Sequence, residues 1–118
     1  MRQPPSIDAY GGGGFRVAGV WRPGSLLILA DEPGDWTASS AAGLTGADFA
    51  AVVAAGRAAS EFVLLGTGRR QVPPPRAVRE TLQSAGLGLE FMASDAAARM
   101  HNVLASQGRR FATALIVI

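Results

Sequence analysis

Short apolar runs, each followed by glycine or polar residues, divide the chain into predicted strands. The clearest is Phe62 to Leu65 in EFVLLGTGRR, which continues directly into a Gly-Thr-Gly turn and two arginines. Such a run is typical of a buried strand that ends in a loop able to face a ligand. Three further runs have the length and apolar character of strands: Ser25 to Ala30, Leu87 to Met92 and Phe111 to Ile118.

The N-terminal third is predicted to be a meander. Ser6 to Tyr10 has the pattern of an edge strand, and the four glycines from Gly11 to Gly14 favour a turn. One strand is predicted over Phe15 to Trp21, followed by a turn at Arg22 to Gly24. Asp31 to Trp36, DEPGDW, contains three acids and a Pro-Gly pair and is predicted to be a loop.

Two helices are predicted in the middle of the chain. Thr45 and Asp48 have the spacing of a capping box, and apolar residues then recur at helical spacing to about Ala59. A run of prolines places Pro75 near the first position of a second helix, and Gly86 fits its end. The residues expected to face inward are Phe49, Val52, Val53 and Gly56 in the first helix, and Val78 and Leu82 in the second.

A third helix is predicted from Ser94 to Gln107. Ser94 is placed to cap it, Asp95 in its first turn is favourable to the helix dipole, and Gly108 fits its end. The residues expected to face inward are Ala97, Met100, Val103 and Leu104.

The order of these elements predicts the fold class. From Ser25 onward, strands and helices alternate, which favours right-handed crossovers and a mixed, mostly parallel sheet. We therefore expect an α/β fold, a single compact domain over residues 1–118 with about three packed helices and an N-terminal β-meander. In such a sheet, the loops after Ala30, Leu65 and Met92 would meet at one edge, where open α/β sheets usually bind ligands.

Composition and charge exclude several classes of function. The chain carries eleven arginines, no lysine and nine carboxylates, for a net charge of +2. The arginines form small groups among acids rather than a basic face, so no nucleic-acid binding is expected. Without lysine there is no Schiff-base chemistry or lysine-dependent phosphate loop, and without cysteine there is no disulfide, thiolate nucleophile or Cys-ligated zinc.

The absence of cysteine suits a reducing compartment. The start, MRQPPS, lacks the apolar core of a signal peptide, and no run approaches the ~18 apolar residues that a membrane span needs. We expect a cytoplasmic protein with no membrane span.

The Gly-Thr-Gly turn is the first candidate site. A dinucleotide fingerprint would need a third glycine opening into a helix, but this chain has Gln71 and then three prolines. One alternative is an anion nest, in which backbone N–H groups and an arginine hold a carboxylate or phosphate. The other is a tight turn with solvated arginines. The candidate ligand-binding residues here are Gly66, Thr67, Gly68, Arg69 and Arg70.

Glu90 and His101 are the other candidates. Glu90 lies in the predicted strand LGLEFM, either as a buried carboxylate with a raised pKa or paired to Arg79 or Arg109, or else on the solvent face. His101 is the only histidine, so mechanisms that need two imidazoles are excluded. It could serve as a lone general base, but an ordinary contact of an amphipathic helix is the favoured interpretation.

Two further stretches are interpreted structurally. Gly11 to Gly14 is followed by Phe15 and Arg16 rather than Lys-Ser/Thr, so a hairpin explains the glycines better than a phosphate cradle. The acids from Asp31 to Asp35 lack calcium-loop spacing and are interpreted as a solvated loop. No metal, cofactor or catalytic residue is predicted. The sequence does not decide whether the protein is an enzyme, and a non-enzymatic protein is favoured.

Several ordered motifs carry a family resemblance. They are Tyr10 with GGGGFR, then GSLLIL, LLGTG, GLGLEFM and AAARMHNVLASQGRRFATALI. Together they resemble the small single-domain family that includes mitochondrial complex I assembly factor three and the adipogenesis-associated domain protein. Two spacings make the resemblance specific: G-x-E-x-M at Gly88, Glu90 and Met92, and N-x-L-x-x-x-x-R at Asn102, Leu104 and Arg109.

The resemblance implies a compact mixed sheet with packed helices, but little chemistry. The mitochondrial relative works with partner proteins during assembly of respiratory complex I and has no established catalytic activity. This chain has Met100-His101-Asn102 where relatives often carry Thr-Tyr-Asn, so a role of that Tyr would not transfer.

Three functional hypotheses follow. The leading one is a non-catalytic protein-binding or assembly protein acting through a surface near the Gly-Thr-Gly edge and Trp36. The second is a small anionic ligand, with or without catalysis, held by Gly66, Gly68 and Arg69. The third is a homo-oligomer formed through the apolar C-terminal strand or the alanine-rich helices.

Overall fold

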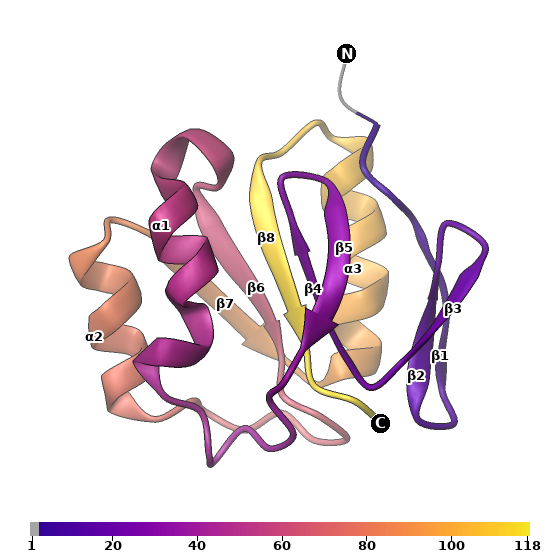
Figure 1. Ribbon diagram of the computed structural model, residues 1–118, viewed down its shortest axis with the longest axis horizontal. Helices are drawn as coiled ribbons and strands as arrows, with labels where there is room; N and C mark the ends of the chain where they lie inside the picture. Colours follow the sequence, from indigo (N-terminus) through magenta and orange to yellow (C-terminus); the bar gives the residue numbers. More distant parts are fainter. Residues whose placement is uncertain (1–2) are drawn as a thin grey trace.

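The computed structural model describes residues 3–118. Its N-terminal part is a small antiparallel sheet of β1 (Ile7–Gly11), β2 (Gly14–Val17) and β3 (Val20–Pro23), as the predicted meander requires (Figure 1). The single strand predicted over Phe15 to Trp21 is wrong, because the chain reverses at Ala18 and Gly19. Both residues have positive φ, 48° and 81°, the conformation of a tight hairpin turn that sequence alone favours mainly for Asn and Gly.

A second sheet of five strands forms the centre of the molecule. Its order is β5-β4-β8-β6-β7, with β6, β7 and β8 parallel to one another and β4 antiparallel to both β5 and β8. The apolar C-terminal strand β8 occupies the central position, as predicted from its composition. The strand bounds are β4 Ser25–Leu29, β5 Glu32–Trp36, β6 Phe62–Gly66, β7 Gly88–Met92 and β8 Phe111–Leu115.

The stretch predicted as a loop after β4 is instead the edge strand β5. The chain turns back at Ala30 and Asp31, which both have positive φ, and pairs with β4 along its whole length. An edge strand tolerates Pro33 and exposed acids because its outer side needs no hydrogen-bond donor. The same reversal makes β4 antiparallel, so the loop after Ala30 does not join those after Leu65 and Met92, contrary to the prediction.

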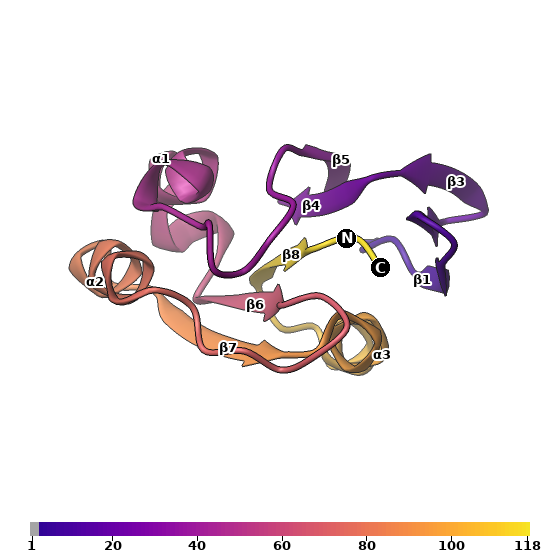
Figure 2. The same cartoon turned by 90° about the horizontal axis from the view of Figure 1, so that it is seen from below.

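The helices α1 and α2 cover one face of this sheet (Figure 2). A 3₁₀ turn, η1 (Gly46–Phe49), precedes α1 (Ala50–Ala59), and α2 runs over Arg76–Ser84. The predicted capping box is confirmed, since the Thr45 N–H donates to Asp48 Oδ2 at 2.7 Å. The fully buried side chains of this core include Phe49, Val52, Val63, Leu65 and Val78.

The third helix and the small sheet cover the opposite face (Figure 2). This helix, α3 (Ser94–Ser106), packs mainly on β6, β8 and β1. Its predicted inward stripe is partly wrong: Ala97 is buried, but Met100 and Val103 are 38% and 49% exposed. The side chains of Ala98 and His101 are buried in their place.

The predicted α/β class is therefore confirmed: one compact unit with mixed sheets, three α-helices and an N-terminal antiparallel meander. The two glycines predicted to end helices are confirmed as well. Gly86 and Gly108 follow α2 and α3 with φ of 76° and 72°, a conformation that glycine adopts without the penalty of a Cβ.

Candidate functional site

The Gly-Thr-Gly turn joins β6 to the segment that leads into α2, and its amides are turned into the protein. The Thr67 N–H donates to the Met92 carbonyl at 2.8 Å, and the Gly68 N–H donates to Ser94 Oγ at 2.9 Å. Residues 66–68 are all buried. An anion therefore finds neither of these two N–H groups free.

Ser94 fixes the turn together with Thr67, whose hydroxyl donates to the Arg70 carbonyl and accepts from the Val72 N–H. Ser94 was predicted to cap α3, but Ala93 takes that position, and the Ser94 hydroxyl accepts from Gly68 and donates to the Ile116 carbonyl at 2.7 Å. This close packing also explains Gly66, because a Cβ there would lie 2.8 Å from both Ser94 Oγ and Leu115 Cδ2. The first glycine of LLGTG thus serves the close approach of β6 and α3.

Arg69 and Arg70 remain exposed beyond the turn. They border a shallow hollow of about 420 Å³ that also includes the hydroxyl residues Ser39 and Ser40 and the backbone around Ile116. Two guanidinium groups near hydroxyls can bind a carboxylate or phosphate through charge-assisted hydrogen bonds. Thr67, Gly68 and both arginines thus line one hollow. Gly66 and Glu90, the other two predicted site residues, do not line it.

Trp36, which was expected to contribute to a surface near this edge, is buried. Its indole N–H donates to the Asp48 carbonyl at 2.9 Å, and its ring packs edge-on against Phe49 with centroids 5.6 Å apart. Trp36 therefore belongs to the core beneath η1, and that part of the surface hypothesis is wrong.

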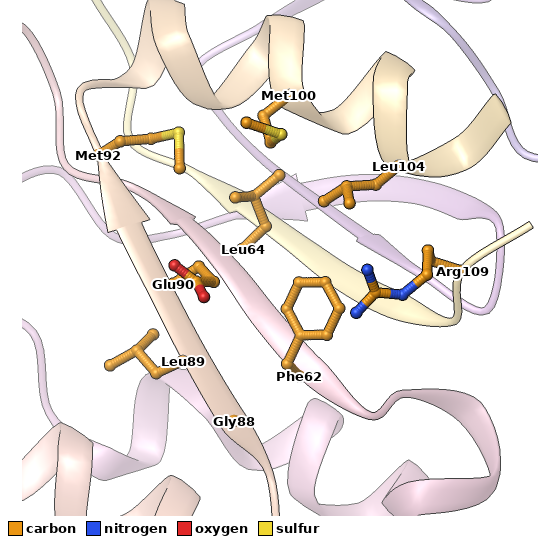
Figure 3. A pocket seen from close by; sticks show the side chains of 9 residues that line it. All are labelled: Phe62, Leu64, Gly88, Leu89, Glu90, Met92, Met100, Leu104 and Arg109. Atoms are coloured by element: carbon orange, nitrogen blue, oxygen red, sulfur yellow. The ribbon is translucent and has the colours of Figure 1, made fainter. Parts of the chain in front are cut away.

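Glu90 lies in a separate cleft between β7, β6 and α3, with a volume of about 410 Å³ (Figure 3). Its carboxylate is exposed, so the interpretation as a buried carboxylate is wrong. The floor is apolar, and the lining residues come from β6, from β7 and α3, which follow each other in the sequence, and from the loop after α3. They are Phe62, Leu64, Leu89, Glu90, Met92, Met100, Leu104 and Arg109, with Gly88 at one end.

Neither arginine proposed as a partner for Glu90 forms an ion pair with it. Arg109 lies over the Phe62 ring, 5.1 Å from its centroid, within the same cleft (Figure 3). Arg79 lies over Phe91, 5.8 Å from its centroid, where β7 packs against α2. Among residues 3–118, Glu90 has no ion-pair partner, while three other acids, Glu61, Glu80 and Asp95, do.

The strand that carries Glu90 has an open outer edge. The Gly88 N–H donates to the Glu61 carbonyl, and the Met92 carbonyl accepts from Thr67, so both residues point their backbone groups toward β6. Because these groups alternate along a strand, those of Leu89 and Phe91 point away from the sheet. β7 is the last strand on this side, and no strand of the described chain pairs with that edge.

His101 is a buried residue of α3 with structural contacts. Its Nε2 lies 2.8 Å from the Pro5 carbonyl and its Nδ1 lies 2.7 Å from Thr113 Oγ1. A carbonyl can only accept, so Nε2 carries the proton and Nδ1 accepts from the Thr113 hydroxyl. Burial lowers the pKa of His101, because the charged imidazolium would lose its hydration.

The remaining candidates have structural roles. Gly11, Gly12 and Gly13 all have positive φ and form the β1–β2 hairpin, as predicted. Within the described chain, no group of three or more His, Cys, Asp or Glu side chains is arranged to hold a metal ion. No helix between residues 3 and 118 has both the length and the apolar character to cross a membrane.

Comparison with known proteins places the chain in a family. The sequence profile of a family described as a protein of unknown function, DUF498/DUF598, matches residues 7–116. The chain belongs to the DUF498/DUF598 family. An uncharacterised family relative from Rhodobacter capsulatus is 36% identical over 110 residues, which cover 93% of this chain and 82% of the relative.

Solved structures agree with this assignment to the DUF498/DUF598 family. A crystal structure described as an outer membrane protein from Bartonella henselae has a TM-score of 0.88 and 30% identity, over 97% of this chain and 95% of that one. A Bordetella pertussis protein described as an Mth938-like domain has a TM-score of 0.77 and 30% identity, over 98% and 90% of the two chains. The fold is thus Mth938-like.

Sequence reasoning found Glu90 but not the cleft around it. The two spacings that carried the family resemblance both contribute to its lining, through Gly88, Glu90 and Met92 from β7, and Leu104 and Arg109 from α3 and the loop after it. The two spacings were the signal available in the sequence. Their convergence on one cleft could not be predicted from it, because it depends on α3 lying over β6, next to β7.

Proposed function

We propose that this chain is a non-catalytic protein-binding protein that acts in the manner of an assembly factor. The observation that carries the proposal is the open edge of β7 beside the cleft that holds Glu90. A strand edge with unpaired backbone groups is a template for pairing with another chain, and soluble proteins usually block such edges. A partner protein would satisfy those groups and cover the cleft.

The resemblance to the complex I assembly factor family supports a partner of this kind. That relative works with other proteins and has no established catalytic activity, and the two motif spacings behind the resemblance border the cleft. The single histidine also supports a non-catalytic role, since both of its ring nitrogens are engaged with Pro5 and Thr113.

Affinity capture of the tagged chain from its source cells tests the proposal. Recovered proteins should include subunits of a larger assembly, with those of respiratory complex I as the first expectation, and the chain should co-migrate with them on native gels. Recovery of no protein above an untagged control would contradict the proposal. Capture from lysates and from separated membrane fractions also tests the proposed cytoplasmic location, for which the absence of cysteine is the support.

The second candidate function is binding of a small anion at Arg69 and Arg70. The hollow beside Ser39 and Ser40 favours it, in a form that uses side chains rather than the Thr67 and Gly68 amides. Titration of inorganic phosphate, followed by NMR, should shift resonances around Arg69 in the wild type and not in a variant that carries both R69A and R70A. A double variant at Arg76 and Arg99 provides the charge-matched control, and equal shifts in both variants would contradict the site.

Of the two surfaces predicted for a homo-oligomer, the alanine-rich helices stay a candidate and the C-terminal strand does not. The apolar strand β8 pairs with β4 on one side and β6 on the other, so it offers no edge to a second copy. That part of the homo-oligomer hypothesis is wrong.

A further inference from the structure

The two edges of the second sheet differ in how they meet solvent. On β5, the edge strand carries Pro33, which has no N–H, between the exposed acids Glu32 and Asp35. Proline and charge are devices that discourage pairing with another strand. On β7, the outward backbone groups belong to Leu89 and Phe91, and no proline interrupts them. The β7 edge is therefore the one suited to receive an added strand.

The face of β7 that borders the cleft offers three positions in a row. Gly88 has no side chain, and a Cβ there would lie 3.0 Å from Phe62 Cβ. The Phe62 ring contacts Arg109 and Phe111 and is still partly exposed. Glu90 comes next, with an exposed carboxylate, and Met92 follows with Met100 behind it (Figure 3). Side chains directly opposite on paired strands lie about 4.5–5.5 Å apart at Cβ, so an added strand would meet these positions in order.

A second copy of this chain fits the edge poorly. In an antiparallel self-pairing, the register that uses the outward groups of both Leu89 and Phe91 places Leu89 opposite Phe91 of the other copy. Glu90 then faces Glu90 of that copy, with Cα atoms about 4.5 Å apart. Like charges directly opposite on paired strands are destabilising. The same geometry favours a different chain that presents a positive charge at this position.

Building on the proposed protein-binding function, we propose that the partner adds an extended segment to β7 as a sixth strand. The segment alternates apolar-x-basic-x-apolar. Its basic side chain faces Glu90, one apolar side chain covers Phe62 next to Gly88, and the other covers Met92. In this mode of recognition the backbone of the two strands supplies affinity, and the alternate side chains supply specificity.

A short probe peptide tests this directly. The blocked peptide acetyl-Thr-Val-Thr-Arg-Thr-Phe-Thr-amide has the required alternation, and replacing its Arg by Glu gives the charge control. On titration into the ¹⁵N-labelled chain, the amide resonances of Leu89 and Phe91 should shift and their hydrogen exchange should slow. The Glu90→Lys variant should bind the Arg peptide about three- to tenfold more weakly, and should bind the Glu peptide better than the wild type does.

A matched control is available on the other edge. Glu32→Lys makes the same charge reversal at an exposed position of β5 and should leave binding of both peptides unchanged. Shifts confined to residues outside β7, no response up to the solubility limit of the peptide, or equal effects of E90K and E32K would overturn strand addition. So would formation of a dimer that E90K strengthens, since the edge would then be occupied by a second copy.

The outcome separates this inference from the proposed function. If the wild type and E90K recover the same partners equally, and the peptide does not slow hydrogen exchange in β7, the protein-binding function is supported and strand addition is contradicted. If the peptide slows hydrogen exchange at Leu89 and Phe91 but no partner is captured, strand addition at β7 is supported and the assembly role is contradicted.

Discussion

The side-chain amide of Asn102 on α3 makes two hydrogen bonds with the backbone of Ile7 on β1. Asn102 Oδ1 accepts from the Ile7 N–H, and Asn102 Nδ2 donates to the Ile7 carbonyl, both at 2.9 Å. One amide thus satisfies both backbone groups of a residue whose own side chain is buried under α3. Together with the bond from His101 to the Pro5 carbonyl, it attaches the N-terminal segment to the helix.

Replacing Asn102 by Ala should loosen this attachment. Two partly buried backbone groups lose their partners, and we expect the free energy of unfolding to fall by about 1–3 kcal/mol. Urea denaturation measures the loss, and hydrogen exchange should show it first in β1 and β2. Val103→Ala, at an exposed neighbouring position of the same helix, should change stability by no more than about 0.5 kcal/mol. Equal losses in the two variants would mean that the Asn102 amide contributes little.

Ser94→Ala should destabilise the Gly-Thr-Gly turn. The Gly68 N–H and the Ile116 carbonyl both lose a buried partner, so a loss of about 2–4 kcal/mol is expected. Ser106→Ala on the same helix removes only an exposed hydroxyl that bonds to Val103 within its own turn, and serves as the control. If S94A matched S106A in urea denaturation, the buried serine would not be what fixes the turn.

Gly66→Ala tests the same contact from the other side. The added Cβ would lie 2.8 Å from Leu115 Cδ2 and 2.9 Å from the backbone Cα of Ser94, which cannot move without shifting α3. Overpacking of a buried site costs about 1–3 kcal/mol. Gly43→Ala, where the nearest atom is 3.8 Å away, should be close to neutral in the same thermal melts. A G66A chain as stable as the wild type would show that β6 and α3 can separate freely.

Local patterns predicted the interior strands and several helix ends because the physical cause is local, although the cap of α3 is Ala93 rather than Ser94. The apolar run of β6, the capping box at Thr45 and the glycine stops each act within a few residues. The edge strand β5 was missed because Pro33 and its acids are equally typical of a loop and of a protected edge. The antiparallel direction of β4 was not predicted, because an apolar run does not indicate in which direction its strand runs relative to its neighbours. Its antiparallel pairing depends on the turn at Ala30 and Asp31.

The candidate site was predicted only in pieces for a similar reason. Glu90, Met92 and Arg109 were identified in the sequence, but their common cleft depends on α3 lying over β6. The stripe of α3 was misplaced by one position because a histidine counts as polar in a periodicity argument. His101 can nevertheless be buried, since Pro5 and Thr113 satisfy both of its ring nitrogens.

His101 should make stability depend on pH in the mildly acidic range. Because burial lowers its folded-state pKa below the ordinary value of about 6.5, the unfolded chain binds more protons below that pH. The contribution of the neutral His101 side chain to the free energy of unfolding is therefore fully present above pH ~6.5 and is lost as pH falls. Between pH 7.5 and 5.5 the loss from this one group is at most about 1.4 kcal/mol.

Replacing His101 by Gln isolates this contribution. The amide can still donate to the Pro5 carbonyl and accept from Thr113, but it does not titrate. Free energies of unfolding from urea melts at pH 7.5 and 5.5 should differ less in H101Q than in the wild type. The two proteins share every other titratable group, so the difference between their pH dependences belongs to His101. An identical pH dependence in the two proteins would mean that the imidazole accepts its proton in the folded state as readily as in the unfolded one.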